Sequence, residues 1–469
     1  MQDTEVIKPF ASTALYRAVS RWHFYAGLFV LPFLLILSLS GALMLLSKPI
    51  EQLLNQQLLT VTPPTSTTTL PASLLLAKVQ ESFPDAKVKL YIPAASIQAS
   101  TQFVLQTATA DHHAGHDSAS TLVYQNPYNG QILGTADPEQ SWYSIFKELH
   151  STLFIGDTGD ALIEIAAGFA VLMLLTGLYM AWPRQSWREF LLDKVPATRE
   201  DWRRLHRLSG LVLAIPLLLF LLSGLAWTNL WGGKLVQAWS SLSINKFDPA
   251  KGAEGHDSMA QKGVHPIPWV LEQSPLPHSS SHGSDHSAQS TAAFTLDAVT
   301  QVAKRQGFSN YRIHFPKDTA GVWTISATTI AGDITNPTAE RTLHLHQGTG
   351  AILADIRFAD YPLLGMAMST FIPFHQGELG LWNWLLAFVL VLLVLLLISS
   401  GFVSWWKRRP KHQLKLAPPV APAKTNTAVI LIMLLIALFF PLSAAVLMVI
   451  ITLDWLWISR WSWLRSVLK

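Results

Sequence analysis

The chain has 469 residues, of which 50% are hydrophobic and only 14% charged, with a formal net charge of +4. This composition is too apolar for an ordinary soluble protein and too polar to lie wholly in a membrane, so we expect membrane spans and aqueous regions. The chain has no cysteine, which excludes disulfides, iron–sulfur clusters and covalent haem attachment through a Cys-x-x-Cys-His motif. The basic residues lie beside the apolar runs and form no patch suited to nucleic acid.

Four long apolar runs predict a membrane α-helical bundle, because each run can cross a hydrocarbon core of roughly 30 Å at about 1.5 Å per residue. A fifth apolar stretch, 427–458, is interrupted by Pro441 and predicts either a C-terminal hydrophobic hairpin or a single span. The N-terminal arm 1–22 and the loops 184–204 and 407–424 carry basic residues, which places these three on the cytoplasmic side. The four core spans are expected at 23–47, 158–183, 205–228 and 375–406.

Two polar regions, 48–155 and 229–374, then lie outside the cytoplasm, in the periplasm of a Gram-negative cell. Each shows a helical pattern followed by alternating, strand-like runs, so we predict one α+β domain in each. The second region contains a Ser-, His-, Gly- and Pro-rich loop, 251–290, without periodicity. The expected helices are 70–83 and 296–306, and the expected strands are 88–92, 102–106, 122–124, 311–315, 322–328 and 341–345.

One histidine pattern occurs twice at a constant offset of 183 residues. His23 lies four residues before Gly27, and His206 lies four residues before Gly210. Because residues one helical turn apart share a face, each glycine leaves space beside its histidine, enough for the edge of a porphyrin. The two runs end in the equivalent pairs Ser40-Gly41 and Ser223-Gly224.

A second pair of histidines, His150 and His375, precedes the second and fourth spans. Gly177 and Gly401 follow them after 27 and 26 residues, a close but unequal spacing. Together the two patterns predict a tandem duplication of a unit made of span, outer α+β domain and span.

The predicted topology places His23 and His206 at the cytoplasmic face and His150 and His375 at the outer face. A lone histidine at a helix end is usually an interfacial residue, but four at equivalent positions of a repeat favour a shared role. Two imidazoles on opposite faces of one haem saturate the iron, which favours electron transfer over oxygen activation. Zinc or copper would demand more donors than either pair offers. We therefore predict two b-type haems, each with two histidine ligands.

These residues resemble the PepSY-associated transmembrane family, whose iron-regulated inner-membrane members include ferric-siderophore reductases. The resemblance covers residues 15–410, although Trp22 precedes His23 where the other motifs have Leu or Phe. It implies that the outer regions are PepSY domains and that the four histidines bind haem. It also implies reduction of a ferric siderophore outside the inner membrane. It is carried by Leu149-His150, Leu205-His206, the two Ser-Gly endings and Phe374-His375-Gln376-Gly377.

No Gly-x-Gly-x-x-Gly follows a strand and no Walker motif is present, so we expect no flavin or nicotinamide site in this chain. The electrons must then come from a quinol or from a donor on the cytoplasmic side. The alternative is a non-enzymatic membrane protein, either a metallophore permease component or a metal-binding scaffold. A permease should carry polar residues in mid-membrane, and the four core spans have almost none beyond Ser and Thr.

The remaining titratable residues support weaker predictions. Two histidine tracts in polar loops could collect Zn²⁺, Cu²⁺ or Ni²⁺, which would make ferric or cupric ion a second possible substrate, or they are solvated low-complexity sequence. Asp157, Asp160 and Glu164 are either a proton path or, as helix N-termini favour, helix-start carboxylates. His314 and His344 lie on predicted strands and are expected to be surface or packing residues. The tracts contain His112, His113 and His116, and His278, His282 and His286.

Overall fold

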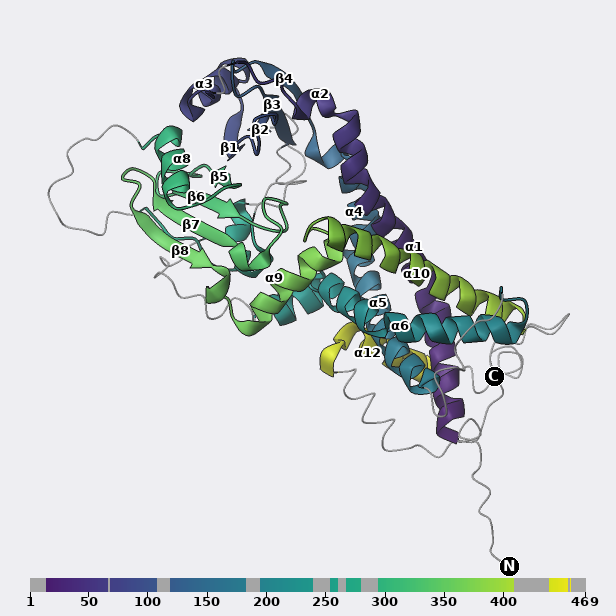
Figure 1. Ribbon diagram of the computed structural model, residues 1–469. Helices are drawn as coiled ribbons and strands as arrows, with labels where there is room; N and C mark the ends of the chain where they lie inside the picture. Colours follow the sequence, from purple (N-terminus) through teal and green to yellow (C-terminus); the bar gives the residue numbers. More distant parts are fainter. Residues whose placement is uncertain are drawn as a thin grey trace, which may run out of the picture. The chain divides into compact units, whose positions relative to one another are not determined.

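The structure is a computed structural model. Its residues divide into two compact units (Figure 1). The first, here called the helical unit, comprises Met1–Ala42, Glu148–Lys234 and Leu386–Lys469, and the second, the sheet unit, comprises Leu43–Lys147 and Leu235–Leu385. The residues that the structure describes are 14–65, 68–107, 119–182, 195–238, 254–259, 267–279, 294–408, 438–453 and 456.

Four described helices are long and apolar enough to cross a membrane, which confirms the four predicted core spans. Helix α1 is longer than expected at both ends, and α10 begins after His375 instead of at it. Helix α6 begins early because Thr198 and Asp201 form a capping box before its apolar run. The four are α1 (Ala14–Leu54), α5 (Gly156–Ala181), α6 (Arg199–Leu225) and α10 (Leu381–Trp406).

Side chains from different spans pack together inside the helical unit. Phe29 of α1 meets Phe169 of α5 with ring centroids 5.6 Å apart. Leu213 of α6 lies in a buried cluster with Leu390 and Val394 of α10. A fifth helix, α12 (Pro441–Leu453), approaches α5 closely, because Gly168 faces Ser443 without a side chain between them. The choice between a hairpin and a single span for 427–458 stays a prediction, since much of that stretch lies outside the described residues.

The carboxylates near the start of α5 cap a second element. The backbone N–H groups of Asn229 and Trp231 donate to Asp160 Oδ2 at 3.0 Å and Glu164 Oε2 at 3.1 Å. Asn229 Nδ2 also donates to Asp157 Oδ1 at 3.1 Å. These bonds satisfy the first N–H groups of η4 (Asn229–Val236), which have no partner within their own helix. The geometry therefore agrees with a structural role for these acidic residues.

Two short helices precede α5 and α10 and carry the second histidine pair. His150 lies in α4 (Trp142–Thr152) and His375 in the last turn of α9 (Leu363–Gln376). Leu153 and Phe154 have positive φ values of 54° and 60°, which end α4 before α5 begins, and Gly377 at φ 77° ends α9. Both histidines thus precede their spans, as expected, but the fourth span begins at Leu381 and not at His375.

The sheet unit contains one antiparallel sheet of eight strands in the order β4-β3-β2-β1-β5-β6-β7-β8 (Figure 1). The sequence predicted one α+β domain in each outer region, whereas the structure joins both regions through pairing of β1 with β5, at Leu90↔His314 and Tyr91↔Ile313. The same order, one helix and then four strands, occurs in both regions. The elements are α3 (Ala72–Ser82), β1 (Lys87–Ile92), β2 (Thr101–Thr107), β3 (Ala119–Gln125), β4 (Ile132–Ala136), α8 (Leu296–Arg305), β5 (Arg312–His314), β6 (Val322–Ala327), β7 (Arg341–His346) and β8 (Ile352–Arg357).

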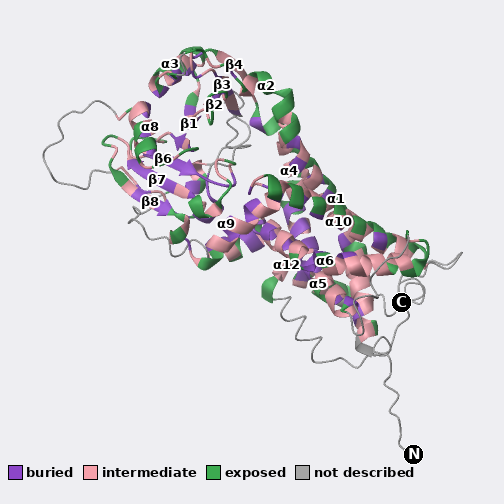
Figure 2. Cartoon of the chain, in the orientation of Figure 1, coloured by how far each residue is buried: buried purple, intermediate pink, exposed green. Residues whose placement is uncertain are grey.

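One face of this sheet forms the apolar core of the unit. Leu75 and Val79 of α3 and Val299 of α8 pack with strand residues such as Ile325 and Leu343, all fully buried. Strand alternation turns the neighbouring residues to the opposite face. There Thr324 of β6 and His344 of β7 are buried as well, and Figure 2 shows β6 and β7 coloured as buried. The second half of the sheet thus has a buried polar face in addition to its apolar one.

Candidate functional site

The structure brings together the first predicted histidine pair. His23 of α1 and His206 of α6 have ring centroids 6.4 Å apart and ring planes inclined at 77°. Two imidazoles bound trans to one metal, with metal–nitrogen bonds of about 2 Å, place their centroids roughly 6 Å apart. The separation therefore fits one metal atom between the two rings.

Hydrogen bonds hold both rings by the same nitrogen. The Nδ1 atom of His23 lies 3.1 Å from Thr176 Oγ1, whose hydroxyl donates to Leu172 O at 2.9 Å, so that Nδ1–H donates and the hydroxyl oxygen accepts. The Nδ1 atom of His206 lies 3.0 Å from the carbonyl oxygen of Leu397, which can only accept. A neutral imidazole protonated on Nδ1 carries its lone pair on Nε2, and such a bond is the usual support of a metal-binding histidine.

A glycine lies beside each of these rings. A Cβ atom on Gly177 of α5 would stand 3.0 Å from Cε1 of His23, and one on Gly401 of α10 would stand 3.0 Å from Cε1 of His206. Each glycine directly follows a hydroxyl residue, and Oγ of Ser400 lies 3.4 Å from His206 Nδ1. The Thr-Gly and Ser-Gly pairs therefore provide a polar support and room for the ring at one place.

The predicted glycines Gly27 and Gly210 have other neighbours. A Cβ atom on Gly27 would meet the terminal methyl of Met173 at 3.2 Å, and one on Gly210 would meet Leu397 Cδ1 at 3.7 Å. Both contacts join transmembrane helices, where small residues commonly allow close approach. A role for Gly27 and Gly210 in haem packing stays a prediction, and the glycines at the rings are Gly177 and Gly401.

His150 is held in the same way as His23. Its Nδ1 atom lies 2.9 Å from Oγ of Ser40, and this hydroxyl donates to Ile36 O at 2.7 Å. A Cβ atom on Gly41 would stand 3.4 Å from Cε1 of His150. The pair Ser40-Gly41, which the sequence marked only as the end of a repeat, is thus the support of a histidine.

His375 belongs to the sheet unit, where the chain around it is fixed by several bonds. Asn383 Nδ2 donates to Phe374 O at 2.9 Å, and Trp384 Nε1 donates to Leu45 O at 2.9 Å. Lys48 and Glu378 form an ion pair close by. The pairing of His375 with His150 in one site stays a prediction from the sequence.

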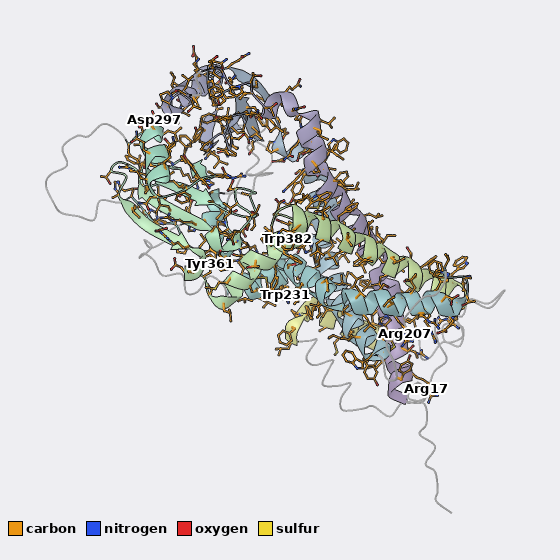
Figure 3. All side chains as sticks on the ribbon, in the orientation of Figure 1. Arg17, Arg207, Trp231, Asp297, Tyr361 and Trp382 are labelled. Atoms are coloured by element: carbon orange, nitrogen blue, oxygen red, sulfur yellow. The ribbon has the colours of Figure 1, made fainter. Side chains whose placement is uncertain are left out.

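Basic side chains lie near the His23–His206 pair. The guanidinium of Arg408 stands 4.9 Å over the ring of Phe24, and that of Arg21 stands 5.9 Å over the ring of Tyr25. Arg207, labelled in Figure 3, directly follows His206 on α6. A haem has two propionate groups, and arginine is well suited to bind carboxylates. The charge at this end of the helical unit therefore fits the predicted cofactor.

The predicted metal-binding tracts lie mostly beyond the part of the chain that the structure describes, which excludes His112, His113, His116, His282 and His286. His278 is described and lines a pocket of about 270 Å³ in the sheet unit. Within the described ranges, no group of three or more His, Asp or Glu side chains could hold a metal ion. Metal binding by these tracts stays a prediction.

Comparison with known proteins gives one result at the level of the family. The family model described as PepSY-associated TM region matches residues 20–408. No curated protein matches the chain. The matched range contains all four predicted haem ligands and every described helix and strand except α12, apart from the first residues of α1.

Proposed function

Since this chain belongs to the PepSY-associated transmembrane family and is a multi-pass membrane protein, we propose that it is a di-haem reductase of the bacterial inner membrane. The proposed substrate is a ferric siderophore in the periplasm, whose Fe³⁺ is reduced to Fe²⁺. The observation that supports this most is the geometry of His23 and His206, with rings spaced for one metal atom and both Nδ1 atoms bonded to other groups.

The residues present fit a b-type haem on three counts. The two Nε2 lone pairs are the donors that a six-coordinate haem iron needs. Because Nδ1–H of each ring is bonded to Thr176 or Leu397, Nε2 is the nitrogen whose lone pair is left for a metal. Leu397, whose carbonyl oxygen bonds His206, packs against the apolar cluster of Leu213, Leu390 and Val394, and apolar neighbours suit a porphyrin. When bound, a haem with two histidine ligands would supply one-electron transfer.

The chain itself has three tasks in this proposal. His23 and His206 would bind the haem iron. Thr176 and the Leu397 carbonyl orient the two imidazole rings. Gly177 and Gly401 leave space beside the rings. If each haem were held by two histidines, its iron would have no free position for substrate, and the chemistry it would supply is electron transfer without binding of the siderophore iron. The hydrogen bonds of both rings would keep the two histidines in place around such a group.

The second haem in the proposal rests on His150 and His375 and on the repeat in the sequence. His150 contributes the same supported geometry as His23, with Ser40 in place of Thr176. With one site at the cytoplasmic face and one at the outer face, the chain would link a quinol or cytoplasmic donor to a periplasmic acceptor. The siderophore, or a ferric or cupric ion, is the proposed acceptor.

The experiment uses the purified chain in proteoliposomes with a reduced quinol inside and a ferric hydroxamate siderophore outside. An external Fe²⁺ chelator that changes colour reports reduction. We expect Fe²⁺ to form in the wild type and not in His206→Ala, with His346→Ala on strand β7 as a control histidine outside the proposed haem sites. A wild-type rate equal to that of protein-free liposomes would contradict the proposal and favour the scaffold or permease alternative.

A further inference from the structure

Two histidines outside the proposed haem sites meet in the interior of the sheet unit. His256 begins the short helix η5 (His256–Met259), and His344 lies in the middle of β7. Both are 0% exposed, and their Nε2 atoms are 3.1 Å apart. The expectation of an ordinary surface or packing role for His344 did not include such a partner, which comes from the histidine-rich loop.

The Nδ1 atoms of His256 and His344 have different hydrogen-bond partners, a carbonyl oxygen and a hydroxyl group. His256 Nδ1 lies 2.7 Å from the carbonyl oxygen of Ser274, which can only accept, so neutral His256 has its lone pair on Nε2. His344 Nδ1 lies 2.9 Å from Thr324 Oγ1, and a hydroxyl can donate or accept. His344 can therefore take either tautomer. In one tautomer His344 donates its Nε2–H to Nε2 of His256. In the other, the Nε2 lone pairs of both histidines face each other.

The surroundings of the pair disfavour a high charge. Burial lowers the pKa of His256 to about 4, with the bond to Ser274 and the nearby Asp257 acting in the opposite direction. Burial and the neighbouring His256 and His314 lower the pKa of His344 well below its usual value. A second lone pair facing the first requires a cation between them, and two neutral donors in a low-dielectric interior suit a single positive charge best.

We infer that His256 and His344 form a two-coordinate site for a soft monovalent cation, Cu⁺ or Ag⁺. Zn²⁺ and Cu²⁺ usually need further donors, and the described residues contain no group of three that could supply them. Imidazole is a suitable ligand for copper. The site lies in the sheet unit and does not depend on the proposed haems.

Binding requires a small movement, and the structure indicates which side provides it. Two collinear metal–nitrogen bonds of about 2 Å each need the nitrogens roughly 4 Å apart, so the 3.1 Å pair must open. His344 is fixed between β6 and β8 by strand pairing. His256 is attached through one isolated bridge, Gly255↔Pro275, and the backbone bonds near it. We therefore expect the segment 254–259 to shift and β7 to stay in place.

A pocket lies close to the pair, since Glu254 and Ser258, which flank His256 in the chain, line it, although the two histidines themselves do not. The pocket of about 270 Å³ is lined by Met259, His278 and His314 among others. The Nε2 atom of His278 is buried without a hydrogen-bond partner among the described residues. A thioether and imidazoles are the side chains that a soft cation passing from solvent toward His344 would contact favourably.

The test measures Cu⁺ binding to full-length protein purified without a histidine tag, under anaerobic conditions, against a chromophoric Cu⁺ chelator. We expect one tight site in the wild type, weakened at least about 100-fold in His256→Gln and in His344→Gln, because each removes one of two ligands. The matched control is His346→Gln on the same strand, whose Nδ1 accepts from the backbone N–H of Gly348 and which should bind as the wild type does. Equal affinity in His344→Gln and the wild type would overturn the inference.

Thermal unfolding with Ag⁺ covers the case in which a glutamine variant fails to fold. A cation that binds only the folded state must raise the Tm of the wild-type protein and of His346→Gln. A wild-type Tm that does not rise with Ag⁺ would overturn the inference even without the variants. Equal rises in the wild type and in a folded His256→Gln would assign binding to other histidines and overturn it as well.

Discussion

The two units each contain a close pair of histidines, and the pairs differ in one distance. In the helical unit the centroids of His23 and His206 are 6.4 Å apart, and their Nδ1 atoms bond to other groups. In the sheet unit the centroids of His256 and His344 are 5.0 Å apart, and the rings are joined by a hydrogen bond. The rings of the first pair are far enough apart for a metal atom between them, whereas those of the second pair share a hydrogen bond. Spacing and second-sphere bonds, more than the presence of two histidines, therefore distinguish a preformed site from one that must open.

Replacing a haem ligand should have the largest effect. His206→Ala removes one of the two axial donors of its site, so we expect loss of one haem and about half of the Soret absorbance of a two-haem protein. His344→Ala should leave the haem spectrum unchanged, since it lies in the other pair. Loss of both haems from a folded His206→Ala protein would contradict the assignment of the ligands to two separate sites.

The equivalent change in the second site tests the part that rests on the repeat. His375→Ala should remove the other haem and leave the first, and the double variant with His206→Ala should be colourless. The visible spectrum of each purified variant gives the result. If His375→Ala keeps the full haem content, the outer ligand pair is wrong.

Filling the space beside a ring should weaken the site without removing a ligand. In Gly401→Ala the new Cβ atom stands 3.0 Å from His206, which must move, whereas in Gly210→Ala it stands 3.7 Å from Leu397, an ordinary contact. We expect the first change to lower haem retention, at a cost of about 1–3 kcal/mol, and the second to be tolerated. Equal haem retention in the two variants would show that the ring does not need the space at Gly401.

Removing the hydroxyl support of His23 should have a smaller effect. Thr176→Val keeps the shape of the side chain and deletes the acceptor of the Nδ1–H bond, so we expect haem affinity to fall about 10-fold. The reduction potential should shift as well, which a purely structural change elsewhere would not produce. Ser399→Ala is the control, because its hydroxyl donates to Leu395 O. A potentiometric titration should show a shifted reduction potential in Thr176→Val and an unchanged one in Ser399→Ala.

The hydrogen-bonded pair of His256 and His344 should make the stability of the sheet unit depend on pH. The pKa of His256 is about 4 in the folded protein and 6.5 in an unfolded chain, so below pH 6.5 the unfolded state binds the extra proton. Stability should therefore fall as the pH decreases from 6.5 to about 4, by roughly 1 kcal/mol per pH unit within this window. Hydrogen exchange in β7 measures it, and His256→Gln should have a flatter pH dependence. An equal slope in both proteins would assign the effect to other groups.

The elements that could be predicted from the sequence are those with a strong local pattern. The four spans and the helices α3 and α8 are regular apolar repeats, and all were expected near their observed places. The strands that were missed, β4 and β8, are the two edges of the sheet. No residue of β4 is buried, so its apolar alternation is weak, and in β8 only Ala354 and Ile356 are buried. The β1–β5 pairing joins Leu90 to His314, a contact between distant residues that leaves no local signal.

The predicted haem ligands could be identified from the sequence, whereas most of the groups that hold them could not. His23 and His206 could be found because the repeat gave them equivalent positions. The support of His206 is the backbone oxygen of Leu397, which no side-chain pattern reveals. The pair Ser40-Gly41 was visible as a run ending, and Gly177 and Gly401 by their spacing from the second histidine pair, but their contacts with the rings required knowing which helix faces which. His256 could not be paired with His344 at all, since it lies in a loop without periodicity.

The visible absorption spectrum of the purified, folded protein tests the central claim most directly. The account predicts a low-spin Soret band and α band upon reduction, with haem amounting to two per chain by pyridine haemochrome assay. A protein that is folded by circular dichroism and colourless, even after incubation with haem, would contradict it.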